Sequence, residues 1–153
     1  MKTMSIVATS GALLALAAAT APASPHSPLS KRAFIASADH LCTAYSKKLD
    51  AITPPGDPEL GPAGASVAYA WHGLEADLHR DLHALRPPAP FAARWHRGLA
   101  SLADRVTAER QLGDAELAYD RKAVARAFSR MNRDGDASGR AFHGYGFKSC
   151  GVT

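Results

Sequence analysis

The stretch FSRMNRDGDASGRAFHGY, residues 128–145, decides whether this chain ends in a long helix or in a loop. By composition, residues 132–139 are typical of a loop. Their spacing is that of a helix, because apolar and small residues recur every three to four positions and stay in register up to Tyr145. We therefore predict continuous helix through 132–139, weakened by two glycines that cost about 1 kcal/mol each relative to alanine. The predicted helix face consists of Leu117, Val124, Phe128, Met131, Gly135, Ser138, Phe142 and Tyr145.

The same stretch resembles part of an EF-hand calcium loop. Asp134, Asp136, Ser138 and Gly139 match positions 1, 3, 5 and 6 of that loop. Position 12, however, is Tyr145 in place of the glutamate that supplies two of the calcium ligands. We therefore expect no calcium site here.

Three further segments with helical spacing precede this stretch. Ser30 is a suitable N-cap for the first, and the proline-rich run 53–58 ends it. The second runs from about residue 63 to 85, and the third from about 91 to 112. The pair Gly113-Asp114 is predicted to separate the third helix from the fourth. The apolar stripes are Phe34, Ala38, Leu41, Tyr45, Leu49 and Ile52; Val67, Trp71, Leu74, Leu78, Leu82 and Leu85; and Phe91, Trp95, Leu99, Leu102 and Val106.

No segment has the alternating pattern of a strand, and the connections between successive helices are short. Short connections favour antiparallel neighbours. The sequence therefore predicts an all-α fold, an antiparallel up-down-up-down four-helix bundle over residues 30–153. Trp71 and Trp95 lie in phase with their stripes, so we expect both to be largely buried.

Residues 1–23 have the pattern of a secretory signal peptide. Lys2 precedes an uncharged, Ala/Leu-rich run over residues 6–19, and Ala21 and Ala23 provide small residues for cleavage after Ala23. The apolar run is too short to span a membrane. We therefore expect a secreted or extracytoplasmic protein with a flexible tail at residues 24–29 and no transmembrane segment after cleavage.

The chain has two cysteines, Cys42 in the first helix and Cys150 near the C-terminus. Two cysteines in an exported protein usually form a disulfide, although two free thiols are the alternative. A disulfide between Cys42 and Cys150 would close a loop of about 100 residues, which is worth up to about 4.7 kcal/mol in the chain-entropy model. We predict that one disulfide closes the bundle.

Four residues of the second helix, His72, Glu75, His79 and His83, are spaced so that they form a column. Two histidines at i and i+4 can bind one metal ion, Glu75 could add an oxygen, and His96 could contribute from the third helix. The column lies to the side of the apolar stripe. Solvated histidines at the core boundary, or a pH-sensing role, are therefore alternatives to a metal site.

Five basic residues share one side of the fourth helix, away from Phe128. They could contact an anionic envelope surface, although a solvated helix face is the common explanation of such a pattern. The formal net charge of +4 is modest, and export disfavours nucleic acid as a partner. The basic face consists of Lys122, Arg126, Arg130, Arg133 and Arg140.

Motifs of catalysis are missing from the sequence. It contains no G-x-S-x-G, H-E-x-x-H, phosphate-binding glycine loop or C-x-x-C-H motif. Cys42 would need an adjacent base to act as a nucleophile, and a disulfide would block it. We therefore expect a protein that is not an enzyme and has no cofactor.

Four segments resemble small exported, alanine-rich helical proteins of high-GC bacteria, most of them uncharacterised. The segments are AFIASADHLC (33–42), LHALRPPAP (82–90), LGDA (112–115) and YGFKSCG (145–151). The resemblance spans most of the chain after residue 23, and residues 132–139 depart from it. It implies a helical bundle with a Cys42–Cys150 disulfide and carries no activity.

Together these observations predict a secreted, non-enzymatic binding or structural module. Its partner would be another extracytoplasmic protein or an anionic envelope surface. A metal-binding bundle that uses the histidine column and an envelope-binding module that uses the basic face are the alternatives.

Overall fold

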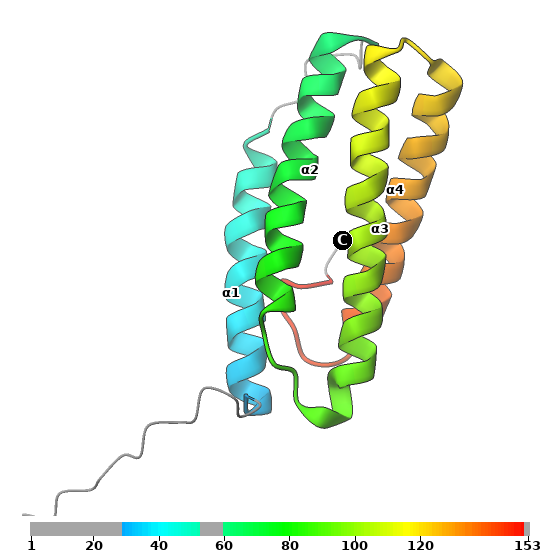
Figure 1. The fold of residues 1–153 in the computed structure, drawn as a ribbon. Coiled ribbons are helices and arrows are strands. Elements are labelled where there is room, and N and C mark those ends of the chain that lie inside the picture. The colour runs from blue at the N-terminus through cyan, green and yellow to red at the C-terminus, as the bar shows by residue number, and fades with distance from the viewer. Residues whose placement is uncertain (1–28, 53–59, 152–153) are drawn as a thin grey trace, which may run out of the picture.

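A computed structural model describes residues 29–52 and 60–151 of the chain, and this part contains four α-helices and no strand. The helices are α1 (Lys31–Asp50), α2 (Pro62–His83), α3 (Ala89–Leu117) and α4 (Arg121–Phe142). Figure 1 shows that successive helices run in opposite directions, so the predicted up-down-up-down bundle is confirmed. The predicted signal peptide and residues 24–28 of the predicted tail lie outside the described residues.

The first two helices begin where the sequence provides a start signal. The Ser30 hydroxyl accepts the backbone N–H of Ala33 at 3.2 Å, as expected of an N-cap. In α2, Pro62 occupies the first helical position, where its missing N–H costs nothing. Leu29, the last residue of the predicted tail, packs against the core, and its N–H lies 3.4 Å from the Arg86 carbonyl oxygen.

The predicted break at Gly113-Asp114 is wrong, because α3 continues to Leu117. Gly113 is buried in the helix interior, and a β-carbon there would lie 2.7 Å from the ring of Tyr69. This glycine therefore allows α2 and α3 to approach closely and does not end the helix.

The true break between α3 and α4 is a Schellman turn at Tyr119. Tyr119 has a left-handed backbone with φ of 54°. Its N–H donates to the Glu116 carbonyl at 3.0 Å, and the next N–H, that of Asp120, donates to the Ala115 carbonyl at 3.1 Å. The Asp120 carboxylate then caps α4, because it accepts the first free N–H groups of that helix. Glycine is the usual residue at the left-handed position, so a tyrosine gave no signal in the sequence.

The prediction of continuous helix through residues 132–139 is confirmed, since α4 runs unbroken to Phe142. The predicted face of this helix needs correction. Leu117 belongs to α3 and is 48% exposed, and Phe128 is 47% exposed. The buried line passes through Ala127, one position before Phe128, because small side chains there permit close packing of α4. Its members are Ala127, Met131, Gly135, Ser138, Gly139 and Phe142.

Aromatic residues form the core at the end of the bundle that holds the C-terminal segment. Trp95 is fully buried, as predicted, with its ring centroid 4.8 Å from that of Phe34 and 4.9 Å from that of Phe142. Tyr145 and Phe147, which follow α4, pack into the same cluster.

A second, smaller cluster occupies the other end of the bundle. It is built from Ala68, Ala108, Leu112, Ala127 and Met131. Trp71 packs at its edge and is partly buried, less completely than Trp95. The face of α2 that the sequence predicted as its apolar stripe is turned partly away from the interior, and Glu75 lies deeper than Trp71.

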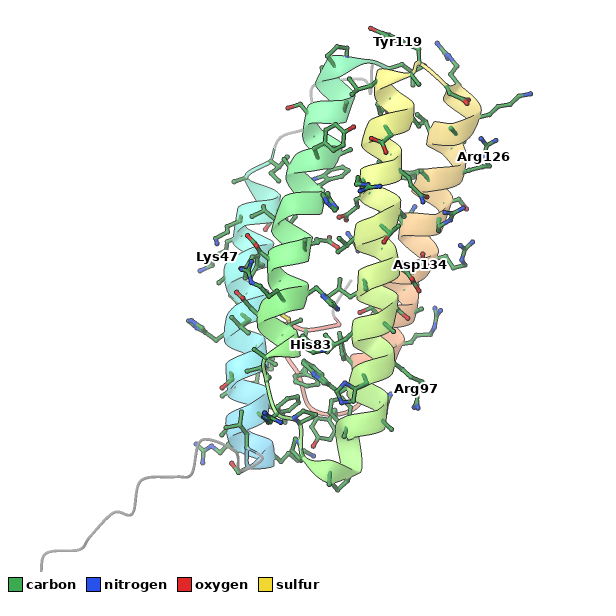
Figure 2. The ribbon with its side chains drawn as sticks, viewed as in Figure 1. Lys47, His83, Arg97, Tyr119, Arg126 and Asp134 are labelled. Atoms are coloured by element: carbon green, nitrogen blue, oxygen red, sulfur yellow. A yellow bond between two sulfur atoms is a disulfide. The ribbon has the colours of Figure 1, made fainter. Side chains whose placement is uncertain are left out.

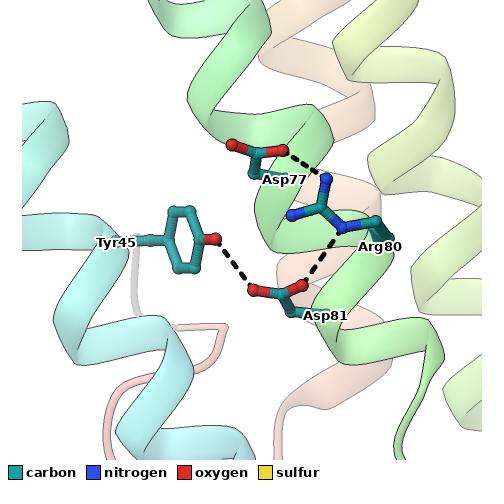
Figure 3. A network of polar contacts seen from close by, with 4 residues as sticks. All are labelled: Tyr45, Asp77, Arg80 and Asp81. Atoms are coloured by element: carbon teal, nitrogen blue, oxygen red, sulfur yellow. Dashed lines mark hydrogen bonds and ion pairs between the residues drawn. The ribbon is translucent and has the colours of Figure 1, made fainter.

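The first helix is attached to the bundle mainly through α2. The Tyr45 hydroxyl of α1 donates to Asp81 Oδ2 of α2 at 2.8 Å (Figure 3). Arg80 Nε lies 3.3 Å from the other oxygen of Asp81, and its Nη1 lies 2.7 Å from Asp77 Oδ1. Burial, and then the hydrogen bond to Asp81, raise the pKa of the Tyr45 phenol.

The C-terminal segment joins α1 to the rest of the bundle. Cys42 and Cys150 form the predicted disulfide, with a Cα–Cα distance of 5.4 Å. The Asp39 carboxylate of α1 accepts the backbone N–H groups of Lys148, Ser149 and Cys150 at 2.9–3.2 Å. In Figure 1 this segment (red) crosses from the end of α4 toward α1.

Packing between helices is most extensive for α3 with α4, then for α2 with α3, and least for α1 with α2. Within residues 29–52 and 60–151, α1 and α4 make no close backbone contact. The bundle is therefore open between its first and last helices. No described helix is both long and apolar enough to cross a membrane.

Candidate binding cleft between α1 and α4

A cleft of about 140 Å³ lies where α1 and α4 fail to pack against each other. All four helices and the C-terminal segment contribute to it. Its apolar part is lined by Leu49, Leu78, Leu82, Leu102, Phe142 and the disulfide. Its polar part is lined by Ser46, Glu75, Arg105, Ser138 and Ser149.

Two of the α4 residues that line the cleft are glycines, which have no side chain to fill it. Gly135 and Gly139 both line it, and Gly135 is buried. A β-carbon at Gly135 would lie 2.7 Å from Nη1 of Arg105. The glycine therefore provides the space in which the Arg105 guanidinium lies against α4, and this is the role of the glycine that the sequence could not reveal.

Arg105 of α3 joins two buried glutamates at the polar part of the cleft. Its Nη2 lies 2.7 Å from Glu75 Oε1, and its Nε lies 3.3 Å from Glu109 Oε1. The side chain of Glu75 is 5% exposed and that of Glu109 is fully buried. The second oxygen of each carboxyl is buried and, apart from the hydrogen bond that the two carboxyls share, has no partner among the residues that the structure describes.

The protonation of this cluster follows from its burial. Burial and the neighbouring charge of Glu75 raise the pKa of Glu109 to about 8, although Arg105 opposes this shift. Burial also raises the pKa of Glu75, and the charge of Arg105 and the hydrogen bond with Glu109 oppose that shift. The shorter contact to Arg105 favours the ionised form of Glu75, so at neutral pH Glu109 carries the proton and donates to Glu75. One carboxylate then balances one guanidinium.

The predicted histidine column is divided by the fold. His72 Nδ1 donates to the Val106 carbonyl oxygen of α3 at 2.9 Å. Glu75 points into the interior, where Arg105 binds it. His79 and His83 stay side by side with ring centroids 6.0 Å apart, and burial followed by the charge of His83 lowers the pKa of His79.

The four column residues are therefore not brought together as ligands. His96 of α3 is exposed, and no three His, Cys, Asp or Glu side chains are grouped around a possible metal position in the described part of the chain. In Figure 2, His83 lies near the C-terminal end of α2.

The predicted basic face exists as one exposed side of α4. All five of its side chains are exposed, and Arg126 points away from the bundle in Figure 2. Arg130 Nη1 donates to Gln111 Oε1 at 2.6 Å, and Arg133 Nε lies 3.6 Å from Asp134 Oδ1. This face lies on the outside of α4, apart from the cleft.

Sequence reasoning missed Arg105 and Glu109 as members of a site. One signal was present, because Glu109 lies seven positions after Leu102 and three before Leu112, and so falls on the apolar face of α3. Arg105, four positions earlier, is placed to pair with it. The approach of Glu75 from α2 depends on how the two helices pack, which spacing within one helix does not show.

No protein-family model matches this chain, and no curated protein or solved structure is significantly similar to it.

Proposed function

We propose that this chain is a secreted, non-catalytic binding module, and that the cleft between α1 and α4 is where it binds a small ligand. The observation that supports this most directly is the buried Glu75–Arg105 pair beside the apolar lining of the cleft. Ligand sites are commonly apolar cavities with a few polar groups that orient the ligand.

Packing alone does not explain this arrangement. Two charged side chains brought out of water are no more stabilising than well-packed apolar residues of similar volume. The glycines of α4 and the open α1–α4 boundary also leave apolar surface partly uncovered at Leu49 and Leu78. A bound apolar group would remove that surface from water.

Secretion is the second part of the proposal. The signal-peptide pattern of residues 1–23 supports it, with cleavage after Ala23. A disulfide is also typical of an oxidising compartment.

Titration with 3-methyl-1-butanol, followed through the methyl NMR signals of Leu78, Leu82 and Leu102, tests the binding site. We expect saturable shifts at these three leucines. Ser46→Leu places an apolar side chain at the α1 wall and should abolish the shifts. Ser129→Leu makes the same change at an exposed position on α4, outside the cleft, and should preserve them. Absence of shifts in the unaltered protein would refute the cleft as a binding site.

A second candidate function is attachment to an anionic envelope surface through the basic face. Five exposed cations on one side of a helix of 22 residues support it. Cosedimentation with vesicles that contain anionic lipid, at low and high salt, tests it. Replacement of Arg126, Arg130 and Arg133 by glutamine should remove any salt-sensitive binding, and binding that survives the replacement would exclude this face.

A further inference from the structure

Two residues of the predicted histidine column remain together in the folded protein. His79 and His83 lie one turn apart at the C-terminal end of α2, where Figure 2 labels His83, and their ring centroids are 6.0 Å apart. His72 is directed instead to a backbone carbonyl of α3, and Glu75 points into the interior. Neither His79 nor His83 lines the cleft, so the pair is a feature separate from the proposed ligand site.

The separation of the two rings is compatible with one shared metal ion. Imidazole nitrogens bind zinc at about 2.0–2.1 Å, which places each ring centroid about 3.2 Å from the metal. Two such rings on one ion are then about 4.5 Å apart at an N–metal–N angle of about 90°, and about 6.4 Å apart at about 180°. The observed 6.0 Å lies within this range. Rotation of the two side chains is therefore sufficient to bring one nitrogen of each ring onto the same ion.

The position of the pair on the helix also favours a bound cation. His83 is the last residue of α2 and is exposed, and His79 is partly exposed, so an ion can reach both rings from solution. The backbone carbonyls at a helix C-terminus carry partial negative charge, which stabilises a cation near the last turn. Arg80, which follows His79 in the sequence, is paired with Asp77 and Asp81, and these carboxylates balance its charge.

We propose that His79 and His83 bind a divalent late transition-metal ion, with Cu²⁺ held most tightly. Imidazole suits copper, nickel and zinc, whereas calcium and magnesium prefer oxygen ligands, and copper forms the most stable complexes of the divalent first-row ions. Within the described residues, no third His, Cys, Asp or Glu side chain is grouped with the pair. The remaining coordination positions are therefore filled by water or by a small ligand from solution.

A copper titration of the untagged, disulfide-bonded protein followed by NMR tests this proposal. Cu²⁺ is paramagnetic, so the ring signals of the histidines that bind it should broaden first. We expect His79 and His83 to broaden at lower Cu²⁺ concentrations than His40 and His96, which are exposed on α1 and α3 and have no histidine one turn away. Equal broadening of all four rings would show adventitious surface binding only and would overturn the proposal.

Two double variants measure what the pair contributes to affinity. His79→Gln/His83→Gln removes the proposed ligands, and His40→Gln/His96→Gln removes the same number of histidines elsewhere. All proteins carry His26→Gln, because a histidine close to the expected mature N-terminus can bind Cu²⁺ together with the terminal amine. In calorimetric titrations we expect the first double variant to bind Cu²⁺ at least about ten-fold more weakly, and the second to stay within about two-fold of its parent. Equal affinities of the two variants would overturn the proposal.

Chelation by two rings predicts two further results. A single imidazole cannot chelate, so His79→Gln alone should lose nearly as much affinity as the double variant that lacks both ligands. The unfolded chain does not hold the two rings one turn apart, so Cu²⁺ should raise the urea midpoint of the parent protein and not that of His79→Gln. A folded His79→Gln protein that keeps its Cu²⁺ affinity within about two-fold of the parent would contradict a shared ion. An equal rise of both midpoints would contradict it as well.

Discussion

Arg105 Nη2 of α3 lies 2.7 Å from Glu75 Oε1 of α2, and this contact places a cation and an anion inside the bundle beside the α1–α4 cleft. The pair connects two neighbouring helices at the point where the first and last helices leave the interior uncovered. Removal of one partner from such a buried pair leaves the other charge uncompensated, which usually costs several kcal/mol. A substitution at Glu75 or Arg105 should therefore change both the stability of the α2–α3 interface and the polar lining of the cleft.

The stability of the protein should decrease as pH rises from about 5 to about 8. The pKa of Glu109 is raised to about 8 in the folded protein from its ordinary 4.5, so between these values the folded state binds more protons than the unfolded state. The free energy of unfolding then falls by up to about 1.4 kcal/mol per pH unit. Urea unfolding at several pH values measures this slope.

Glu109→Gln is the matched control for that prediction. Glutamine keeps an N–H donor toward Glu75 and cannot ionise. Between pH 5 and pH 8 the free energy of unfolding of the variant should therefore rise relative to that of the wild type. A difference that does not change with pH would show that Glu109 has an ordinary pKa.

Cys150→Ser should lower the free energy of unfolding by about 2–5 kcal/mol. The disulfide holds the segment that carries Tyr145 and Phe147 against the aromatic core, and it closes a separation of 108 residues. Denaturant unfolding without reductant measures the loss. The double variant Cys42→Ser/Cys150→Ser should be no less stable than the single variant, and a large additional loss would point to a role of Cys42 beyond the disulfide.

Substitution of Trp95 should cost more stability than substitution of Trp71, and the Trp95 ring should be less accessible to solvent. Trp95→Ala should cost about 3–5 kcal/mol, because the ring is fully buried among Phe34, Phe91 and Phe142. Trp71→Ala should cost less, because its ring is partly exposed at the edge of the smaller cluster. Quenching of the two single-tryptophan proteins by iodide checks the order, and equal quenching would contradict it.

Gly113→Ala should destabilise the protein by about 1–3 kcal/mol. Alanine favours helix, but its methyl group would lie 2.7 Å from the Tyr69 ring of α2, so this ring would have to move from its position against α3, where its hydroxyl donates to Asp114. Gly73→Ala is the control, because Gly73 is exposed within α2 and nothing lies within 4 Å of the added carbon. That change should stabilise by up to about 1 kcal/mol. Thermal unfolding of both variants should give shifts of opposite sign.

Protein recovered from the culture medium or periplasm of an expressing bacterium should begin at Ser24. The small residues at Ala21 and Ala23 favour cleavage at that bond. Mass spectrometry of the intact protein measures the start. An unprocessed chain that stays in the cytoplasm with reduced cysteines would contradict the proposal of secretion.

The sequence alone determined the helical class, three of the four helix starts to within a few residues, and the unbroken course of α4 through residues 132–139. These features depend on spacing and on local signals such as Ser30 and the proline runs, which act over a few residues. The disulfide between Cys42 and Cys150 was predicted on a different ground, because the chain has only two cysteines and the pattern of an exported protein, and the structure confirms it.

Tertiary structure decided the role of particular glycines and charges. Gly113 followed by Asp114 is the pattern of a helix end, and only the position of the Tyr69 ring from α2 shows that this glycine makes room for a side chain of the neighbouring helix. Glu75 has the spacing of a surface column with three histidines, and only Arg105 from α3 shows that it is a buried partner. Such contacts join residues about 30 to 45 positions apart, and they depend on the rotation of each helix about its axis, which a single-helix pattern leaves free over several tens of degrees. The cleft exists for the same reason, since only the packed bundle reveals that α1 and α4 do not meet.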